Sequence, residues 1–412
     1  MPSSLRLASS FVVAACIFPR LISAVPSVSD PCAAIAGKTF VPPADALACY
    51  KAFPFSEKLR QNVLTNVARV FDFFTFENYY LNSPAPFQES TVNIRGKIAK
   101  INSTKYQTDY DFNKDLYDFT TQLNDGHTRW FPSCYTIFQN ILPAPVITIE
   151  EKGVQGVYVA FDSVDFLSQL GPAYTGYFDS IKFDWKRLQG AKVIEIDGQE
   201  PYTYVDKIAR TVSGNYLDHN VRVNSVFSSY RISGTSFSQR LGDLAGPTTV
   251  TQSSLTFKLI PVNSTKAETV NVPFLASYNG APFTDSKSFW STNCAANENT
   301  NGVDLKTLKT SELPRRLAKA SIIQDGSRNA VGINLPPQFV PTLPPLPGSE
   351  GVIKSYALPD KKTGILFVGS FEPDDFFAFQ SDVVAAVKSF KAAGITRLLI
   401  DLTNNGGMAQ VL

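Results

Sequence analysis

Histidine is the scarcest chemistry-bearing residue in this 412-residue sequence, which contains only His127 and His219. Two histidines argue against a histidine-rich metal site and make each of them worth inspecting as a catalytic group. The sequence also lacks a P-loop, a dinucleotide fingerprint, an H-E-x-x-H motif and an EF-hand loop. Its cysteine spacing does not resemble a zinc site. We therefore expect neither a cofactor nor a bound metal.

The sequence also has no marked excess of positive or negative charge, since it contains 38 Lys and Arg and 36 Asp and Glu. A net charge of +2 gives no electrostatic footprint for a nucleic-acid partner. Beyond the N-terminus no apolar run reaches the roughly 18 residues of a membrane span. A hydrophobic content of 44% excludes wholesale disorder, and the length leaves room for two or three domains.

The N-terminus reads as a secretory signal peptide. Arg6 precedes an apolar stretch over residues 7–18, which is too short to span a bilayer, and cleavage is expected after Ala24. A buried N-terminal helix is the alternative, but Pro19 interrupts its pattern. Without residues 1–24, which hold Arg6 and Arg20 and no acid, the chain has 36 basic and 36 acidic residues. These features predict a secreted protein.

Cysteine usage fits the secretory route. Cys16 would leave with the signal peptide, and an even number of cysteines in a secreted chain predicts disulfides. Four cysteines allow three pairings, of which proximity in sequence favours Cys32–Cys49 with Cys134–Cys294. Two glycosylation sequons begin at Asn102 and Asn263.

The N-terminal half after a Cys- and Pro-containing segment is predicted to be helical. Apolar residues at spacings of three and four predict a helix from an N-cap at Ser56 to Phe74, and a second one over 112–123. The second helix should end at Asn124-Asp125-Gly126, with Gly126 as a left-handed cap. Residues 127–131 then read as a strand.

From about residue 145 short strands are expected, over 146–149, 157–160 and 192–198, followed by a helix at about 201–212. This mixture indicates a small β-domain. Residues 281–330 are polar and uninformative, and 331–349 carry six prolines and no charge. We interpret the latter as an extended connector; a docking ligand for a partner is the alternative.

The last 60 or so residues predict a parallel crossover of strand 364–369, a helix and strand 396–402. Asp374 or Asp375 should cap the helix. Its inward face should carry Phe376, Phe379, Val383, Val387 and Phe390. A first crossover cannot cover its own sheet, so the sequence is expected to stop partway into a domain.

Two segments of the sequence contain residues that could take part in catalysis. His127 follows a helix in a turn, which can project a side chain into a cleft, and could serve as a general base; a structural histidine is the alternative. Gly406 and Gly407 follow the carboxyl end of the second crossover strand, where ligands of α/β sheets gather. Successive glycines let backbone N–H groups approach an oxyanion. His219 matches no motif and is expected to be structural or solvated.

Taken in order, Leu-Asn-Asp-Gly-His-Thr at 123–128, Ile-Asp-Gly at 196–198 and Ile-Asp-Leu-Thr-Asn-Asn-Gly-Gly at 400–407 resemble the C-terminal-processing (tail-specific) serine peptidase family. The likeness is to its fungal secreted branch, similar to chlamydial protease-like members with a Ser-His-Glu arrangement. It covers roughly residues 30–407.

The resemblance implies an α/β multidomain protein, α+β overall, whose catalytic core is crotonase-like. After the signal peptide at 1–24, an N-terminal helical region would span 25–140, a PDZ-like domain 145–275, a polar and Pro-rich linker 276–350, and the truncated start of the core 351–412.

The resemblance also implies site residues. His127 matches the family's catalytic base, Asp125 and Gly126 match the turn that positions it, and Gly406 and Gly407 match the oxyanion turn. The implied reaction is acyl transfer from a peptide bond to a serine.

The nucleophile has no matching position in this sequence. In the family that serine lies well downstream of the glycine turn, and Met408 stands where a third glycine is usual. No G-x-S-x-G elbow replaces it. We therefore expect a truncated or mis-spliced gene product, inactive alone.

The substrate implied by the resemblance is a protein or peptide. Processing of precursor peptides in a fungal ribosomal-peptide pathway is one possible role, and general secreted proteolysis is another. The alternative is a non-catalytic secreted peptide-binding protein that uses the PDZ-like domain. The sequence predicts no oligomeric state.

Overall fold

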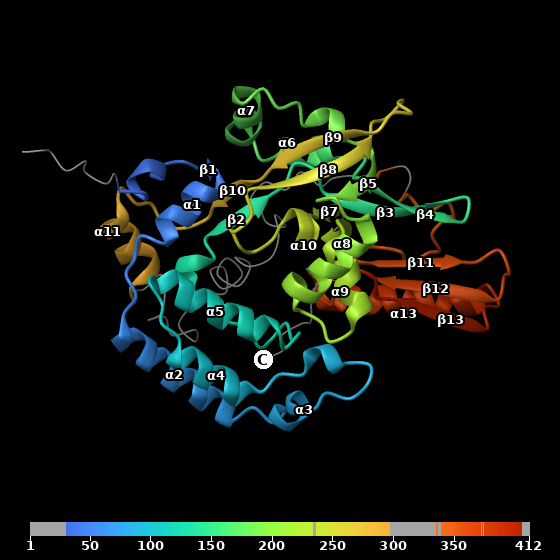
Figure 1. The fold of residues 1–412 in the computed structure, drawn as a ribbon. Coiled ribbons are helices and arrows are strands. Elements are labelled where there is room, and N and C mark those ends of the chain that lie inside the picture. Colours follow the sequence, from blue (N-terminus) through green and yellow to red (C-terminus); the bar gives the residue numbers. More distant parts are fainter. Residues whose placement is uncertain are drawn as a thin grey trace, which may run out of the picture.

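The computed structural model describes residues 30–405 apart from 234–235, 297–334, 337–338, 372 and 374. The expected signal peptide at 1–24, with Cys16, lies outside the described residues, as do Gly406 and Gly407. The described chain combines helices with four β-sheets, which is the mixed fold that the sequence predicts (Figure 1).

The N-terminal part is a set of helices around a common core. They are α1 (Pro43–Tyr50), α2 (Glu57–Asp72), α3 (Glu77–Leu81), α4 (Ile94–Ser103) and α5 (Asp109–Thr121), with short 3-10 turns η1 (Ala33–Ile35), η2 (Gln88–Ser90) and η3 (Ser133–Tyr135). The predicted N-cap is confirmed, since Ser56 Oγ accepts a hydrogen bond from the Leu59 N–H at 3.4 Å. Buried apolar side chains of α2, α4 and α5 pack together, as their spacing predicts.

A three-stranded sheet binds distant parts of the sequence to this helical region. Its order is β1 (Phe40–Val41), β10 (Leu275–Tyr278) and β2 (Phe138–Ile141), all antiparallel. The expected disulfides Cys32–Cys49 and Cys134–Cys294 are confirmed. The second one ties π-helical η6 (Trp290–Cys294), which follows α11 (Ser286–Phe289), to η3.

The expectation of a linker beginning at residue 276 is therefore wrong for its first part. This part contains the end of β10 and all of α11 and η6. Phe289 is fully buried and packs in the same core as Tyr50 and Phe53. Aromatic burial and the disulfide outweigh the polar composition that suggested a linker.

The central β-domain is a five-stranded antiparallel sheet in the order β3-β4-β5-β8-β9. Its helices include α8 (Pro201–Ile208), which continues into the π-helical turn η5 (Ala209–Ser213), as the sequence predicts for 201–212. The strands are β3 (Val146–Glu151), β4 (Val154–Val159), β5 (Lys192–Ile196), β8 (Ser254–Ile260) and β9 (Glu268–Pro273). The helices and turns are α6 (Ser163–Ser168), α7 (Pro172–Ser180), η4 (Lys186–Leu188), α8 (Pro201–Ile208), η5 (Ala209–Ser213), α9 (His219–Val226) and α10 (Gly242–Ala245).

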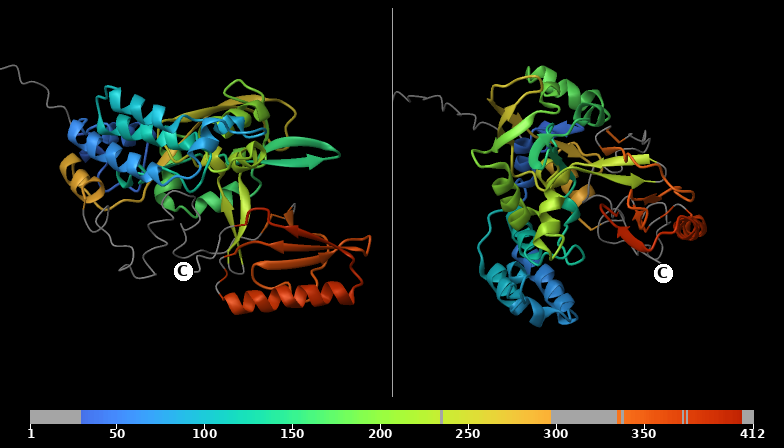
Figure 2. Two further views of the ribbon diagram at one scale, coloured as in Figure 1. Left: turned by 90° about the horizontal axis from the view of Figure 1, so that it is seen from below. Right: turned by 90° about the vertical axis from the view of Figure 1, so that its right-hand side faces the viewer.

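The C-terminal unit has the predicted crossover. β11 (Ile353–Ala357) pairs antiparallel with β12 (Thr363–Val368), which pairs parallel with β13 (Arg397–Asp401). Helix α13 (Phe376–Ala392) lies along one face of this sheet (Figure 2). Asp375 is its N-cap, because Oδ1 accepts hydrogen bonds from the Phe377 and Ala378 N–H groups.

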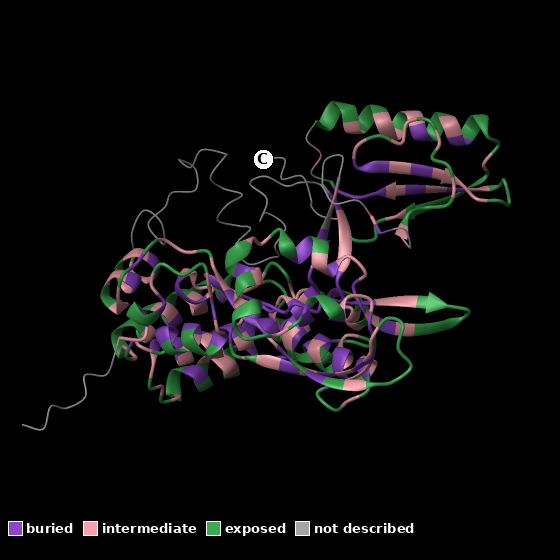
Figure 3. Ribbon diagram, turned by 90° about the horizontal axis from the view of Figure 1, so that it is seen from above, coloured by how far each residue is buried: buried purple, intermediate pink, exposed green. Residues whose placement is uncertain are grey.

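The inward face of α13 is narrower than its sequence suggests. Phe390 is buried and Phe379 and Val383 pack on the core, whereas Phe376 is 48% and Val387 38% exposed. β13 is also exposed along its length, including the apolar stretch Leu398–Ile400 (Figure 3). Within the described chain β13 is an edge strand, with β12 on one side and no strand on the other.

The hairpin of β6 (Ser229–Ser233) and β7 (Ser236–Arg240) joins the β-domain to the C-terminal unit (Figure 2). Ile232 of β6 is 2% exposed and packs in the core formed by β11, β12 and α13. The ring of Tyr230 lies 5.2 Å from that of Phe339, centroid to centroid. The Pro-rich stretch also packs here, since Pro347 O accepts a hydrogen bond from Ser389 Oγ.

The asparagines of both predicted glycosylation sequons lie at the surface. Asn102 and Asn263 are both exposed, as glycosylation would require. In the ranges that the structure describes, no helix is long and apolar enough to cross a membrane.

Candidate active site

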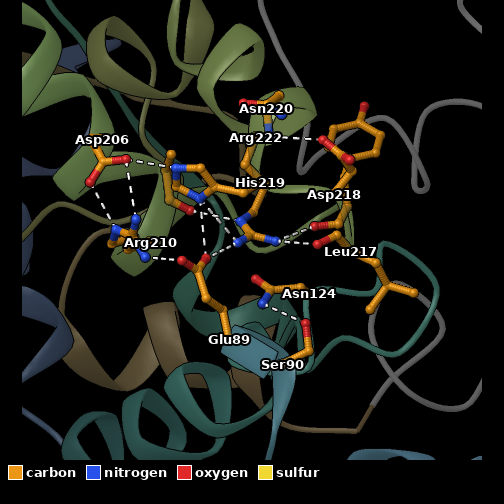
Figure 4. Close-up of polar contacts among 12 residues, drawn as sticks. Glu89, Ser90, Asn124, Asp206, Arg210, Leu217, Asp218, His219, Asn220 and Arg222 are labelled. Atoms are coloured by element: carbon orange, nitrogen blue, oxygen red, sulfur yellow. Dashed lines mark hydrogen bonds and ion pairs between the residues drawn. The ribbon is translucent and has the colours of Figure 1, made fainter. Parts of the chain in front are cut away.

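The turn that carries His127 is anchored from the N-terminal side by Asn124. This residue adopts a left-handed conformation with φ 53° and is buried. Its Nδ2 donates to Ser90 Oγ at 3.0 Å, across 34 residues of sequence (Figure 4). The left-handed residue of the turn is thus Asn124, and the prediction of Gly126 in this role is wrong. Asparagine adopts the left-handed region more readily than most residues, and here the distant Ser90 hydroxyl holds its side chain in place.

Gly126 is needed for a different reason. A Cβ atom on this residue would lie 3.2 Å from the backbone oxygen of Asn215, which follows η5. The absence of a side chain therefore lets the turn pack closely against the β-domain.

Asp125 holds the second half of the turn. Its Oδ1 accepts a hydrogen bond from the His127 N–H at 2.9 Å, and its Oδ2 accepts one from Thr128 Oγ1 at 2.6 Å. The His127 side chain is 88% exposed, and its Nδ1 lies 3.7 Å from Asp125 Oδ1. The arrangement presents an accessible imidazole near a fixed carboxylate, at a separation longer than a hydrogen bond. An accessible imidazole of this kind can serve as a general base.

Residues 127–131 do not form the predicted strand. Side chains of α5 take the backbone and ring donors of this segment: the Trp130 N–H donates to Thr120 Oγ1 and its Nε1 to Asn113 Oδ1. Because these contacts satisfy the segment, no partner strand is required.

A hollow of about 60 Å³ lies next to the turn. It is formed where the segment after His127 meets the end of η5 and the start of α10. Its lining includes Arg129, Phe131, Ser213, Asn215, Arg240 and Asp243. These lining residues could not be recognised as a group from the sequence. The one local indication of a charged site near His127 was the arginine two residues after it.

His219 belongs to a network of charges behind the turn (Figure 4). Its Nε2 lies 2.6 Å from Asp206 Oδ1, and its Nδ1 lies 3.1 Å from Glu89 Oε2. Glu89 also pairs with Arg210 and with Arg222, whose side chain is 1% exposed. The expectation of a structural histidine agrees with these contacts.

The network fixes the position of the turn. Glu89 and Ser90 are adjacent in η2, so the ion pairs of Glu89 to α9 and η5 also hold the Ser90 hydroxyl that binds Asn124. The buried guanidinium of Arg222 donates further hydrogen bonds to three backbone oxygens, of Ala209, Tyr216 and Leu217. A charge buried with this many partners keeps a defined geometry.

The oxyanion turn predicted at Gly406 and Gly407 lies outside the described residues. Just before it, Asn405 Nδ2 donates to Val368 O on β12 at 2.8 Å. Between described residues, no hydrogen bond or ion pair joins the turn at 124–128 to the C-terminal sheet. Among the described residues no group of three or more His, Cys, Asp and Glu side chains could hold a metal ion.

No protein-family model matches the chain. Two curated proteins of Diaporthe leptostromiformis are similar to it: peptidase S41 family protein phomP1', 25% identical, and peptidase S41 family protein phomP1, 24% identical, each over 344 residues. The match covers 80% of this chain and 45% of each relative, so the chain spans less than half the length of these relatives. Their family name confirms the resemblance to the tail-specific peptidase family that the motifs carry.

Proposed function

We propose that this chain supplies the general base of a serine-type endopeptidase, and that the base is His127. The observation that carries the proposal is the turn itself: an 88% exposed imidazole beside the Asp125 carboxylate, on a backbone that Ser90 and Asn215 hold from two sides. The likeness to peptidase S41 family proteins supports peptide-bond hydrolysis as the reaction.

In the proposed reaction a serine hydroxyl attacks the peptide carbonyl, and His127 accepts the hydroxyl proton and returns it to the leaving amine. Asp125 would orient the imidazole through its Nδ1 side. Gly406 and Gly407 would offer backbone N–H groups to the developing oxyanion. No serine of this sequence is assigned as the nucleophile, so the proposal concerns the base and the oxyanion turn.

Secretion is part of the proposal. The two disulfides are typical of oxidising compartments, and the exposed sequons at Asn102 and Asn263 fit passage through the secretory pathway. We further propose that the substrates are precursor peptides or secreted proteins, as expected from the family resemblance.

Hydrolysis of a peptide library by the protein secreted from its complete transcript tests the base. His127→Ala should lower kcat/KM by about 10²- to 10⁴-fold, because a general base contributes that much. Lys266→Ala is the control, since this exposed residue of the β8–β9 connection belongs to neither the turn nor the charge network that holds it; hydrolysis by this variant should persist. Undiminished hydrolysis by His127→Ala would overturn the assignment.

Peptide binding without catalysis is the second candidate function, and the edge of the five-stranded sheet favours it. Among the described strands β3 pairs only with β4. At its other edge the Ser228 N–H already donates to Val146 O at 2.7 Å, so an added strand could pair only with the part of β3 beyond Val146. Helix α8 lies near this strand, because Tyr202 OH and Thr148 Oγ1 are 2.8 Å apart. A pure binder would take up peptides equally well with His127→Ala and would hydrolyse none.

A further inference from the structure

The hollow beside the His127 turn contains a positive charge that no acid neutralises. Arg129 Nη1 donates to Asn215 Oδ1, and Nη2 donates to Tyr117 OH and Thr121 Oγ1, both at 3.3 Å. All three acceptors are neutral. Among the described residues no carboxylate lies within ion-pair distance of Arg129.

The other arginine of the hollow is different. Arg240 pairs with Asp243 at 2.9 Å. The charged lining of the hollow is thus Arg129, Arg240 and Asp243, with a net charge of +1. Because water access is restricted in a hollow, such an uncompensated charge attracts an anion more strongly than a fully exposed arginine does.

Two buried polar atoms around the hollow lack partners. Ser213, at the end of η5, is 3% exposed and its Oγ has no hydrogen-bond partner. Arg129 Nε has none either. Buried donors of this kind are uncommon, and both atoms lie behind the surface of the hollow, shielded from solvent.

The backbone that follows η5 packs very closely against the end of α5. Gly214 is left-handed with φ 54°, and a Cβ on it would lie 2.4 Å from Thr121 Cγ2. This packing brings Asn215 to both Gly126 and Arg129. The hollow and the candidate base therefore share one supporting residue.

We propose that this hollow binds a carboxylate of the peptide substrate, with Arg129 as its ionic partner. A guanidinium is the side chain best suited to a carboxylate. The rings of Tyr117 and Phe131 lie against the guanidinium, 5.5 and 5.0 Å from its carbon to each centroid, and leave an apolar wall for the ligand's stem. The proposal rests on the proposed function for the peptide nature of the ligand.

Binding of labelled peptides, followed by fluorescence anisotropy at low salt, tests the site without any need for catalysis. Three matched peptides are compared: internal Gln with an amidated C-terminus, internal Glu with an amidated C-terminus, and internal Gln with a free C-terminus. We expect one carboxylate peptide to bind about tenfold more tightly than the amide reference, which corresponds to ~1.4 kcal/mol. The peptide that does so identifies the carboxylate as a side chain or a terminus. Equal affinity for all three overturns the proposal.

Two variants assign that preference to Arg129. Arg129→Met removes the charge and keeps an apolar stem; Asn215→Asp keeps the size of the side chain and supplies an internal carboxylate to Arg129. Both variants should bind the carboxylate peptide and the amide reference with nearly equal affinity. Asn215→Asp gives this result even if Arg129→Met fails to fold. Arg187→Met, at an exposed ion pair with Glu268, is the control and should keep the preference.

A tenfold preference that survives in Asn215→Asp would contradict the role of Arg129. The test is separate from the proposed function: loss of hydrolysis in every assay would leave the binding preference intact, whereas absence of the preference would leave His127 catalysis unaffected.

Discussion

Asp360 shows how one exposed residue can hold a turn through its charge. In the connection from β11 to β12, its Oδ1 accepts hydrogen bonds from the Lys362 and Thr363 N–H groups at 2.9 and 2.8 Å. Its Oδ2 accepts one from Thr363 Oγ1 at 2.7 Å and lies 3.3 Å from Arg397 Nη2. Hydrogen bonds to the ionised form lower the pKa of Asp360 to about 2.

This shift predicts an acid-dependent loss of stability. A lowered pKa in the folded state stabilises the protein above the unfolded value of 3.8, and that stability is lost as the pH falls from there toward about 2. Thermal melts should therefore show Asp360→Asn less stable than the wild type near neutral pH, with the difference shrinking below pH ~4. A difference that stays constant down to pH ~2 would contradict the assignment.

At the candidate site, residue-scale prediction extends only as far as the local signal. His127 can be proposed from the sequence because its own turn carries Asp125 and Gly126. The partners that build its surroundings come from far along the chain: Asn215 is 86 residues from Arg129, and Glu89 is 133 residues from Arg222. No periodicity or spacing in one sequence encodes such contacts, so the hollow and the charge network could not be anticipated.

At the scale of elements, the regular pieces were the most predictable. The helices α2 and α5 and the strands β3, β5 and β12 follow from spacing and alternation, because one face of each meets a core. The two element predictions that were wrong failed because contacts with distant residues outweighed the local sequence pattern. Residues 127–131 are apolar enough for a strand but bind α5 through side chains, and residues 276–294 are polar yet anchored by Phe289 and a disulfide.

The junction of two elements, the β6–β7 hairpin and the C-terminal sheet, can be tested by a substitution that adds one carbon. A Cβ on Gly369 would lie 1.8 Å from Ile232 Cγ2, and Ile232 is 2% exposed. Gly369→Ala should therefore cost about 1–3 kcal/mol of unfolding free energy. Denaturant titration with linear extrapolation measures this loss.

The compensating variant makes the test specific. Ile232→Ala alone should cost about 2–5 kcal/mol through the cavity it leaves. In the double variant the new methyl enters that space, so its cost should be smaller than the sum of the single costs by ~1 kcal/mol. Additive costs would mean that the two residues do not contact each other in solution.

At the scale of the whole molecule, the two disulfides differ in the amount of chain they close. Cys32–Cys49 encloses a separation of 17 residues and Cys134–Cys294 one of 160. In the chain-entropy view, the longer loop contributes about 5 kcal/mol and the shorter about 3. Removing the long-range pair as Cys134→Ala with Cys294→Ala should thus destabilise the protein more than Cys32→Ala with Cys49→Ala.

Urea unfolding of the two double variants measures this order, with fully reduced wild type as the reference. The reduced wild type should be less stable than either variant, because it loses both crosslinks. The reverse order between the two variants would show that local strain or residual structure outweighs loop length.

The sheet β1-β10-β2 has a consequence for how the chain acquires its structure. Its strands come from residues 40–41, 138–141 and 275–278, with the latest strand in the middle. During synthesis the first two strands must wait for the third, since neither pairs with the other. The helices α2–α5 and the Cys32–Cys49 bridge can form early from nearby residues, but the core around Tyr50 stays open until about 290 residues have emerged. Its aromatic side chains are then exposed for that interval, so this region should be prone to aggregation while the chain is being made.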